Sequence, residues 1–110
     1  MSAAAPLGAF EEQVLLAVVR TSAEAYGMSV RRELEEVTGR DVAIGAVYAT
    51  LDRLEAKGLV ASRRAELAGQ SRRLFALTGA GGRALAETRA MRDRLWRGVD
   101  LAGLLSGGIP

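Results

Sequence analysis

The chain has 110 residues, which is enough for one compact domain and too short for two independent cores. Hydrophobic residues make up 49% of it and charged residues 25%, as in a globular protein, which excludes a disordered chain. It contains no cysteine and no histidine, which excludes disulfides, thiol nucleophiles, imidazole bases and zinc sites built from these residues. We therefore expect no metal, no cofactor and no enzymatic activity.

Charge is distributed unevenly along the chain. Residues 1–42 carry seven acids and four arginines, whereas residues 43–110 carry eleven lysines and arginines and six acids. A polyanionic partner would meet the later part of the chain, although solvated surface arginines explain the same imbalance. No apolar run approaches the ~18 residues of a membrane span, and the N-terminus lacks a signal-peptide pattern, so we expect a cytoplasmic protein with no membrane partner.

The first half of the chain predicts three helices after a flexible leader, residues 1–8. Apolar residues recur at helical spacing over residues 9–20, 27–38 and 44–57, and Gly39 and Gly58 stand where the second and third helices should end. Two helices of about three turns joined by some four residues match a helix-turn-helix. The expected buried residues are Phe10, Val14, Ala17 and Val18 in the first helix, Val30, Leu34 and Val37 in the second, and Val47, Leu51 and Leu54 in the third.

The second half predicts a β-hairpin followed by a long helix. Two short runs, residues 59–64 and 72–77, flank a segment that contains Gly69 and favour a hairpin, but its tip lacks a two-residue turn signature, which predicts a loose tip and leaves the register open. Thr78 is a suitable N-cap for a final helix over residues 79–98, although Gly81 stands where a capping box has Glu. Residues 101–110 are expected to form a partly ordered tail.

This order of elements predicts a mainly α fold with a small β-hairpin, that is, a winged helix-turn-helix over residues 9–78 with a C-terminal dimerisation helix over residues 79–100. In this plan the third helix enters the DNA major groove and the hairpin reaches sideways to the backbone or minor groove. A thin core in so short a chain also favours a homodimer.

The expected DNA-contacting face of the third helix lies opposite its buried stripe and consists mostly of residues with small side chains. Gly45, Ala46 and Ala49 would allow close approach, and the hydroxyls of Tyr48 and Thr50 would bond phosphates. Arg53 would reach a phosphate or a guanine edge. The alternatives are a surface ion pair of Arg53 with Asp52 or Glu55, and a half-buried packing role for Tyr48.

Four arginines bracket the tip of the predicted hairpin, and we expect them to straddle a sugar-phosphate backbone. They are Arg63, Arg64, Arg72 and Arg73. The alternative is an edge hairpin that its charges keep soluble.

The run IGAVYATLDRLEAKGLV, residues 44–60, resembles the signature of PadR-family transcriptional regulators. LLAVV, AYG and RRELEE before it and SRRLFALTGAGGRAL after it resemble the same family, so the likeness covers about residues 8–90. It implies a winged helix-turn-helix homodimer that binds palindromic operators in double-stranded DNA and often represses nearby genes. Carried onto this sequence, it implies DNA contacts by Gly45, Ala46, Tyr48, Ala49 and Arg53, with the four arginines as wing candidates.

The resemblance also implies a role for the last helix, because some family members hold flat aromatic drugs between paired C-terminal helices. Leu85, Met91, Leu95 and Trp96 are the expected dimer-interface or effector-binding residues, and Trp96 is the single tryptophan of the chain. Trp96 as an interface anchor and Trp96 as an effector contact both stay open. A winged helix that has lost specific DNA binding and serves as a protein-interaction module is the alternative to the regulator.

Overall fold

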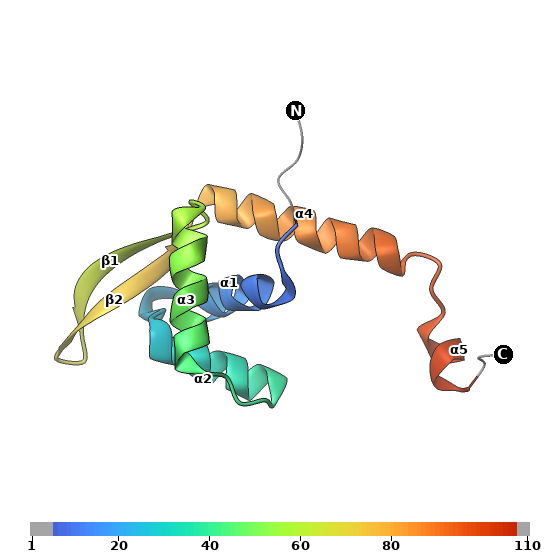
Figure 1. Cartoon of the computed structure of the whole chain (residues 1–110), viewed down its shortest axis with the longest axis horizontal. Helices are drawn as coiled ribbons and strands as arrows, with labels where there is room; N and C mark the ends of the chain where they lie inside the picture. Colours follow the sequence, from blue (N-terminus) through green and yellow to red (C-terminus); the bar gives the residue numbers. More distant parts are fainter. Residues whose placement is uncertain (1–5, 108–110) are drawn as a thin grey trace.

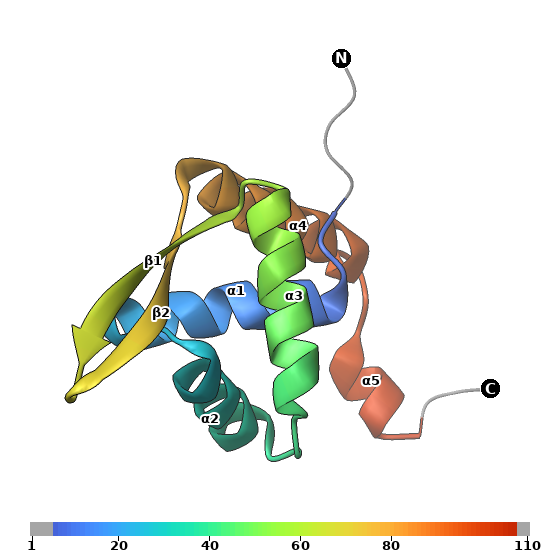
Figure 2. The same cartoon turned by 60° about the vertical axis from the view of Figure 1, so that its left-hand side comes forward.

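Three helices, a two-stranded hairpin and a long C-terminal helix follow one another in the computed structural model, which describes residues 6–107. Figures 1 and 2 show the first three helices packed together, with the hairpin projecting from one side of them and the long helix leading away on the other. The predicted fold class is confirmed. The elements are α1 (Ala9–Thr21), the 3-10 helix η1 (Ser22–Glu24), α2 (Gly27–Thr38), α3 (Ile44–Ala56), β1 (Val60–Leu67), β2 (Gln70–Leu77), α4 (Gly79–Trp96) and α5 (Leu101–Leu105).

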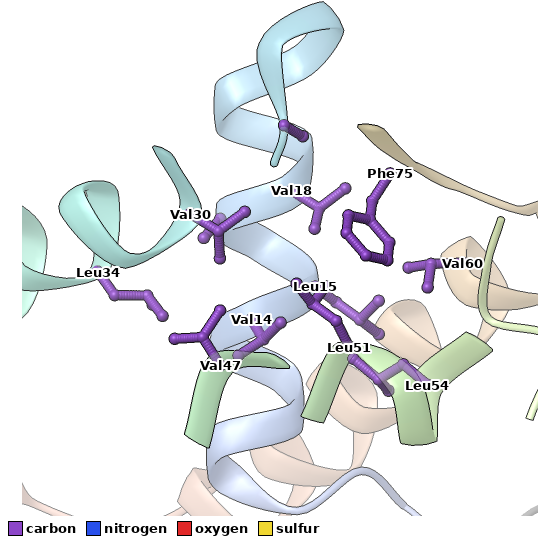
Figure 3. Close-up of a cluster of buried hydrophobic side chains, with 12 residues drawn as sticks. Val14, Leu15, Val18, Val30, Leu34, Val47, Leu51, Leu54, Val60 and Phe75 are labelled. Carbon is purple, nitrogen blue, oxygen red and sulfur yellow. The ribbon is translucent and has the colours of Figure 1, made fainter. Parts of the chain in front are cut away.

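The core lies where α1, α2, α3 and the base of the hairpin meet (Figure 3). The predicted stripe of α3 is confirmed, because Val47, Leu51 and Leu54 are all 0% exposed. The prediction that Val37 is buried is wrong. Its side chain is 60% exposed and lines an open hollow between α1 and α2, together with Leu16. The core residues are Val14, Leu15, Ala17, Val18, Ala25, Val30, Leu34, Val47, Leu51, Leu54, Val60 and Phe75.

The hairpin closes in a tight turn, so the predicted loose tip is wrong. The strands pair antiparallel from Val60 opposite Leu77 to Leu67 opposite Gln70, which leaves only Ala68 and Gly69 between them. Both have positive φ, 53° and 78°, as in the two-residue turns that match the twist of a hairpin. Glycine adopts this backbone freely and alanine at a cost of about 1 kcal/mol, which is why the sequence carried a weak turn signal.

The start of α4 is fixed by hydrogen bonds and by one close backbone approach. Thr78 is the N-cap, as predicted: its Oγ1 accepts from the Gly81 N–H at 3.0 Å and donates to the Gly58 carbonyl at 2.7 Å. Gly81 is buried, and a Cβ at this position would overlap the carbonyl oxygen of Leu59 and the side chain of Leu77. This contact explains why glycine replaces the glutamate of a capping box.

The two ends of the described chain carry more structure than the sequence predicts. Leu7, within the predicted leader, packs against the core, and its N–H donates to Thr88 Oγ1 at 3.2 Å. Within the predicted tail, α5 begins after Asp100, whose carboxylate accepts from the Gly103 N–H at 3.0 Å. Residues 1–5 of the leader and 108–110 of the tail lie outside the described residues. None of the helices within residues 6–107 has the length and apolarity needed to cross a membrane.

Replacing Gly81 by alanine should lower the free energy of unfolding by about 1–3 kcal/mol, because the added methyl group overlaps a backbone carbonyl that has no room to move. Gly82→Ala is the matched control, since its Cβ would meet Leu77 Cδ2 at an ordinary 3.8 Å and alanine favours a helix. Urea denaturation of both variants measures the difference. Equal midpoints for the two would contradict the close approach.

Candidate nucleic-acid interface

The side of α3 opposite the core is open to solvent. Gly45, Ala46, Ala49, Asp52 and Arg53 are exposed, and a Cβ built on Gly45 meets nothing within 4 Å. Figure 1 shows α3 at the outside of the body, beside the hairpin. Among residues 6–107, no segment covers this face of small side chains.

Thr50 does not belong to this face. It is 3% exposed, because it lies at the edge of the buried stripe, about one helical turn from both Val47 and Leu54. Its Oγ1 lies 3.4 Å from Arg53 Nη2, from which it accepts a hydrogen bond. The expectation that the Thr50 hydroxyl bonds a phosphate is therefore wrong.

Tyr48 combines packing with exposure. Its side chain is 40% exposed, yet its ring lies so close to Gly27 that a Cβ there would overlap the ring. The glycine at the start of α2 thus makes room for a tyrosine of α3. Tyr48 is both the half-buried packing residue of the alternative and a side chain with one edge free for a ligand.

Arg53 pairs with neither of the acids expected from the sequence. Its Nε lies 3.4 Å from Glu11 Oε2 of α1, and the Lys57 Nζ lies 2.8 Å from the same oxygen. The hydrogen bond from Lys57 is the main cause that lowers the pKa of Glu11 below its ordinary value, and that from the Gly8 N–H adds to it. Because the Arg53 side chain stays 53% exposed, it can still reach a ligand beside α3.

The strand register divides the four hairpin arginines between two faces. Arg64 is opposite Arg73 on one face, while Arg63 is opposite Leu74 and Arg72 is opposite Ala65 on the other. The four arginines are therefore not equivalent, and their joint contact with one sugar-phosphate backbone stays a prediction. Arg63 and Arg64 are exposed, and within the described chain neither has a carboxylate within 4.0 Å.

Arg73 binds the hairpin to α3. Its Nη1 donates to Asp52 Oδ1 at 2.8 Å and its Nη2 donates to Glu55, while its guanidinium lies 4.7 Å from the Phe75 ring centroid. Asp52 is the main cause that raises the pKa of Arg73. Glu55 also accepts from the Ser62 hydroxyl at 2.7 Å and from its N–H at 3.0 Å, and the Ser62 hydroxyl, followed by Arg73, lowers the pKa of Glu55. In the free chain Arg73 therefore has an intramolecular role, and its expected DNA contact stays a prediction.

Arg72 stacks on Tyr26, a residue that the sequence analysis did not select. Its guanidinium lies 4.3 Å from the Tyr26 ring centroid, and Arg32 Nη2 donates to the Tyr26 hydroxyl at 3.1 Å. Tyr26 lies in the AYG run, which indicated the family but not a position beside β2. No local spacing connects it with Arg72, because the contact is made by tertiary packing.

The end of α4 exposes apolar surface. Leu95 is 70% and Trp96 53% exposed, and Val99 and Leu101 beyond them are also exposed. Met91 is half-buried. Leu85 packs against the core of its own chain, so it differs from the other expected interface residues.

The chain matches, over residues 15–87, the model of the family described as the transcriptional regulator PadR-like family. It belongs to that family. This PadR-like chain is 40% identical over 76 residues to transcriptional regulator Rv3488 of Mycobacterium tuberculosis, covering 69% of this chain and 70% of that protein. The resemblance noted in the sequence is confirmed, and the chain is a transcriptional regulator rather than an enzyme.

Solved structures agree with this placement. A PadR family regulator from Eggerthella lenta is 29% identical with a TM-score of 0.66, covering 84% of this chain and 80% of that one. H. salinarum RosR is 32% identical with a TM-score of 0.64, covering 87% and 82%. A PadR-like regulator from Bacillus cereus shares the fold, with a TM-score of 0.72 at 22% identity and coverage of 87% and 90%.

The contacts of Glu55 predict a pH-dependent contribution to stability. Because folding lowers the pKa of this carboxylate, its contribution is fully present above the unfolded pKa of about 4.3 and is lost as the pH falls through the folded value. Glu55→Gln should therefore unfold at lower urea than the native chain at pH 7, and the difference should shrink below about pH 4. A difference that stayed constant from pH 7 to pH 3 would contradict this account. Glu36→Gln on α2, an exposed position, is the control.

Proposed function

We propose that this PadR-like chain is a homodimeric repressor that binds a palindromic operator in double-stranded DNA, with α3 of each subunit in the major groove. The observation that supports it is the exposed, small-residue face of α3. A major groove about 12 Å wide accepts one α-helix, and small side chains let that helix approach the base edges closely. Gly45, Ala46 and Ala49 are the residues that permit this approach.

Two polar side chains of α3 complete the proposed contact. The Tyr48 ring, held against Gly27, presents its exposed edge to the sugar-phosphate backbone. Arg53 exchanges the carboxylate of Glu11 for a phosphate or a guanine edge, since its pair with Glu11 is long, at 3.4 Å, and the Arg53 side chain is 53% exposed.

The hairpin supplies the second proposed contact. Arg63 and Arg64 are its exposed cations free of acidic partners within the described chain, and they suit the backbone beside the groove that α3 enters. Arg73 keeps the hairpin at its angle to α3. The proposal thus gives Arg63 and Arg64 the backbone contact and Arg73 a positioning role.

The dimer is proposed from the end of α4. Leu95 and Trp96 expose apolar side chains that a second copy would cover, and Trp is enriched at protein interfaces. A two-fold dimer matches an inverted repeat, and a protein bound across a promoter excludes polymerase from it, which is the proposed basis of repression. Such a regulator works in the same compartment as the DNA that it binds, for which we propose the cytoplasm.

Selection of duplexes from a random pool tests DNA recognition and its symmetry together, and an inverted repeat is the expected outcome. Ala49→Glu should then weaken binding of the selected duplex more than tenfold, because a carboxylate would enter the groove beside the phosphates. Ala86→Glu, an exposed position on α4, adds the same charge away from α3 and should bind normally.

The opposite outcome would favour the protein-interaction module. The acids that hold Arg53, Lys57 and Arg73 weaken the positive field and give that alternative its support. Weak binding without sequence preference, unchanged by Ala49→Glu, would contradict the regulator.

Trp96 should report dimer formation by its fluorescence. The side chain is half exposed in one chain, so its burial by a second copy should shift the emission to shorter wavelength as protein concentration rises. Leu95→Glu should abolish both the shift and the dimer mass in sedimentation equilibrium, while the urea midpoint at low concentration is unchanged. A monomer at all concentrations would contradict the proposed dimer.

The same signal tests a small-molecule effector held by Met91, Leu95 and Trp96. Quenching by planar cationic or phenolic compounds in the dimer would support such a site. Unchanged emission across the panel would contradict it.

A further inference from the structure

Tyr26 lies between two arginines from different elements. Arg72 of β2 stacks over its ring at 4.3 Å from the centroid, and the Arg32 guanidinium lies 5.8 Å from the same centroid. Arg32 Nη2 also donates a hydrogen bond of 3.1 Å to the Tyr26 hydroxyl. Two positive charges are therefore held against one phenol.

These two charges are not neutralised by a nearby acid. Within residues 6–107 no carboxylate lies within 4.0 Å of either guanidinium, whereas Arg31, the neighbour of Arg32, pairs with Glu35 at 3.5 Å. Glu24 is near enough to act on Tyr26 by its charge without forming an ion pair with either arginine. The Nε atoms of Arg72 and Arg31 are both buried without a hydrogen-bond partner in the described chain, so the distinction between these two arginines is the Glu35 carboxylate beside Arg31. Two close cations without a counter-ion favour the binding of an anion.

The Tyr26 hydroxyl is free to donate. It accepts the hydrogen bond from Arg32, so its own hydrogen is available for a second partner. That hydrogen bond from Arg32 lowers the pKa of Tyr26, which makes the hydroxyl a better donor. A donor hydroxyl beside two guanidinium groups is suited to a phosphate oxygen.

This cluster borders the proposed DNA-contacting face. Gly27 directly follows Tyr26, and the ring of Tyr48 from α3 packs against the backbone of Gly27. Figure 2 shows the hairpin beside the segment that leads into α2. A duplex that meets α3 and the hairpin would therefore pass this cluster.

We propose that Tyr26, Arg32 and Arg72 together bind one phosphodiester of the DNA backbone in each half of the operator, through the Tyr26 hydroxyl and the two guanidinium groups. The inference rests on the proposed DNA-binding function and adds a binding site that includes Tyr26 and Arg32, residues for which sequence analysis predicted no contact. The alternative is a stack that only fastens the hairpin to α2.

Salt dependence distinguishes the two. With the full-length protein and the selected duplex, Arg32→Ala should weaken binding about tenfold near 0.1 M salt. It should also reduce the log-log salt slope by about 2 per dimer, since each lost phosphate contact contributes about 0.9. Tyr26→Phe keeps the ring and the Arg72 stack but removes the hydroxyl, and should weaken binding with little change of slope. Arg31→Ala is the matched control, with unchanged slope, because Glu35 already neutralises that charge.

A change in the DNA locates the contact without altering the protein. Replacing phosphates one at a time by uncharged methylphosphonates should reveal one position per half-site at which the native protein loses affinity and Arg32→Ala loses no more. Arg32→Lys, which keeps the charge, should regain part of the salt slope. If Arg32→Ala does not fold, the methylphosphonate scan is carried out with Arg32→Lys instead.

The outcomes separate this inference from the function on which it rests. If Arg32→Ala and Tyr26→Phe bind with native affinity and slope, or if no methylphosphonate position is coupled to Arg32, the phosphate site is refuted while DNA binding stands. If the native protein selects no duplex, the proposed function fails and the phosphate site fails with it.

Discussion

The burial of one stripe of α3 is the constraint on which the rest of the structure depends. Val47, Leu51 and Leu54 are completely buried in the core with α1 and the base of the hairpin, and helical periodicity then turns the opposite side of α3 outward. Because Gly45, Ala46 and Ala49 on that side have little or no side chain, the backbone of α3 is accessible there, beside the exposed Tyr48, Asp52 and Arg53. A large side chain on this face would leave the core intact and alter what the helix can approach.

Ion pairs between separate elements surround α3. Glu11 of α1 holds Arg53 and Lys57 on one side, and Asp52 and Glu55 hold Arg73 of β2 on the other. Each pair joins residues of two different elements, so together the pairs orient the hairpin and α1 relative to α3. They also divide the cations into those used within the chain and those left for a partner, a division that net charge does not reveal.

The elements of the fold were predictable because each carries its own periodic pattern and end signal. The three helices, Thr78 as a cap and the exposed face of α3 follow from local sequence. Val37 and Thr50 were misplaced because whether the edge of a helix is covered depends on the neighbouring element. The pairing of Arg73 with α3 and the stack on Tyr26 were missed for the same reason: the partners, Glu55 and Arg72, are distant in sequence, and only the packed chain brings them together.

The close approach of Gly81 to the Leu59 carbonyl bears on the spacing of a bound pair. It seats the first turn of α4 on the junction between α3 and the hairpin, and together with the Thr78 hydrogen bonds it fixes where α4 leaves the body. In an assembly joined through the far ends of these helices, that direction determines how far apart the two copies of α3 stand. Successive major grooves on one side of a duplex recur about every 34–36 Å. The lack of a side chain at position 81 therefore helps to set whether two copies of α3 can match that spacing.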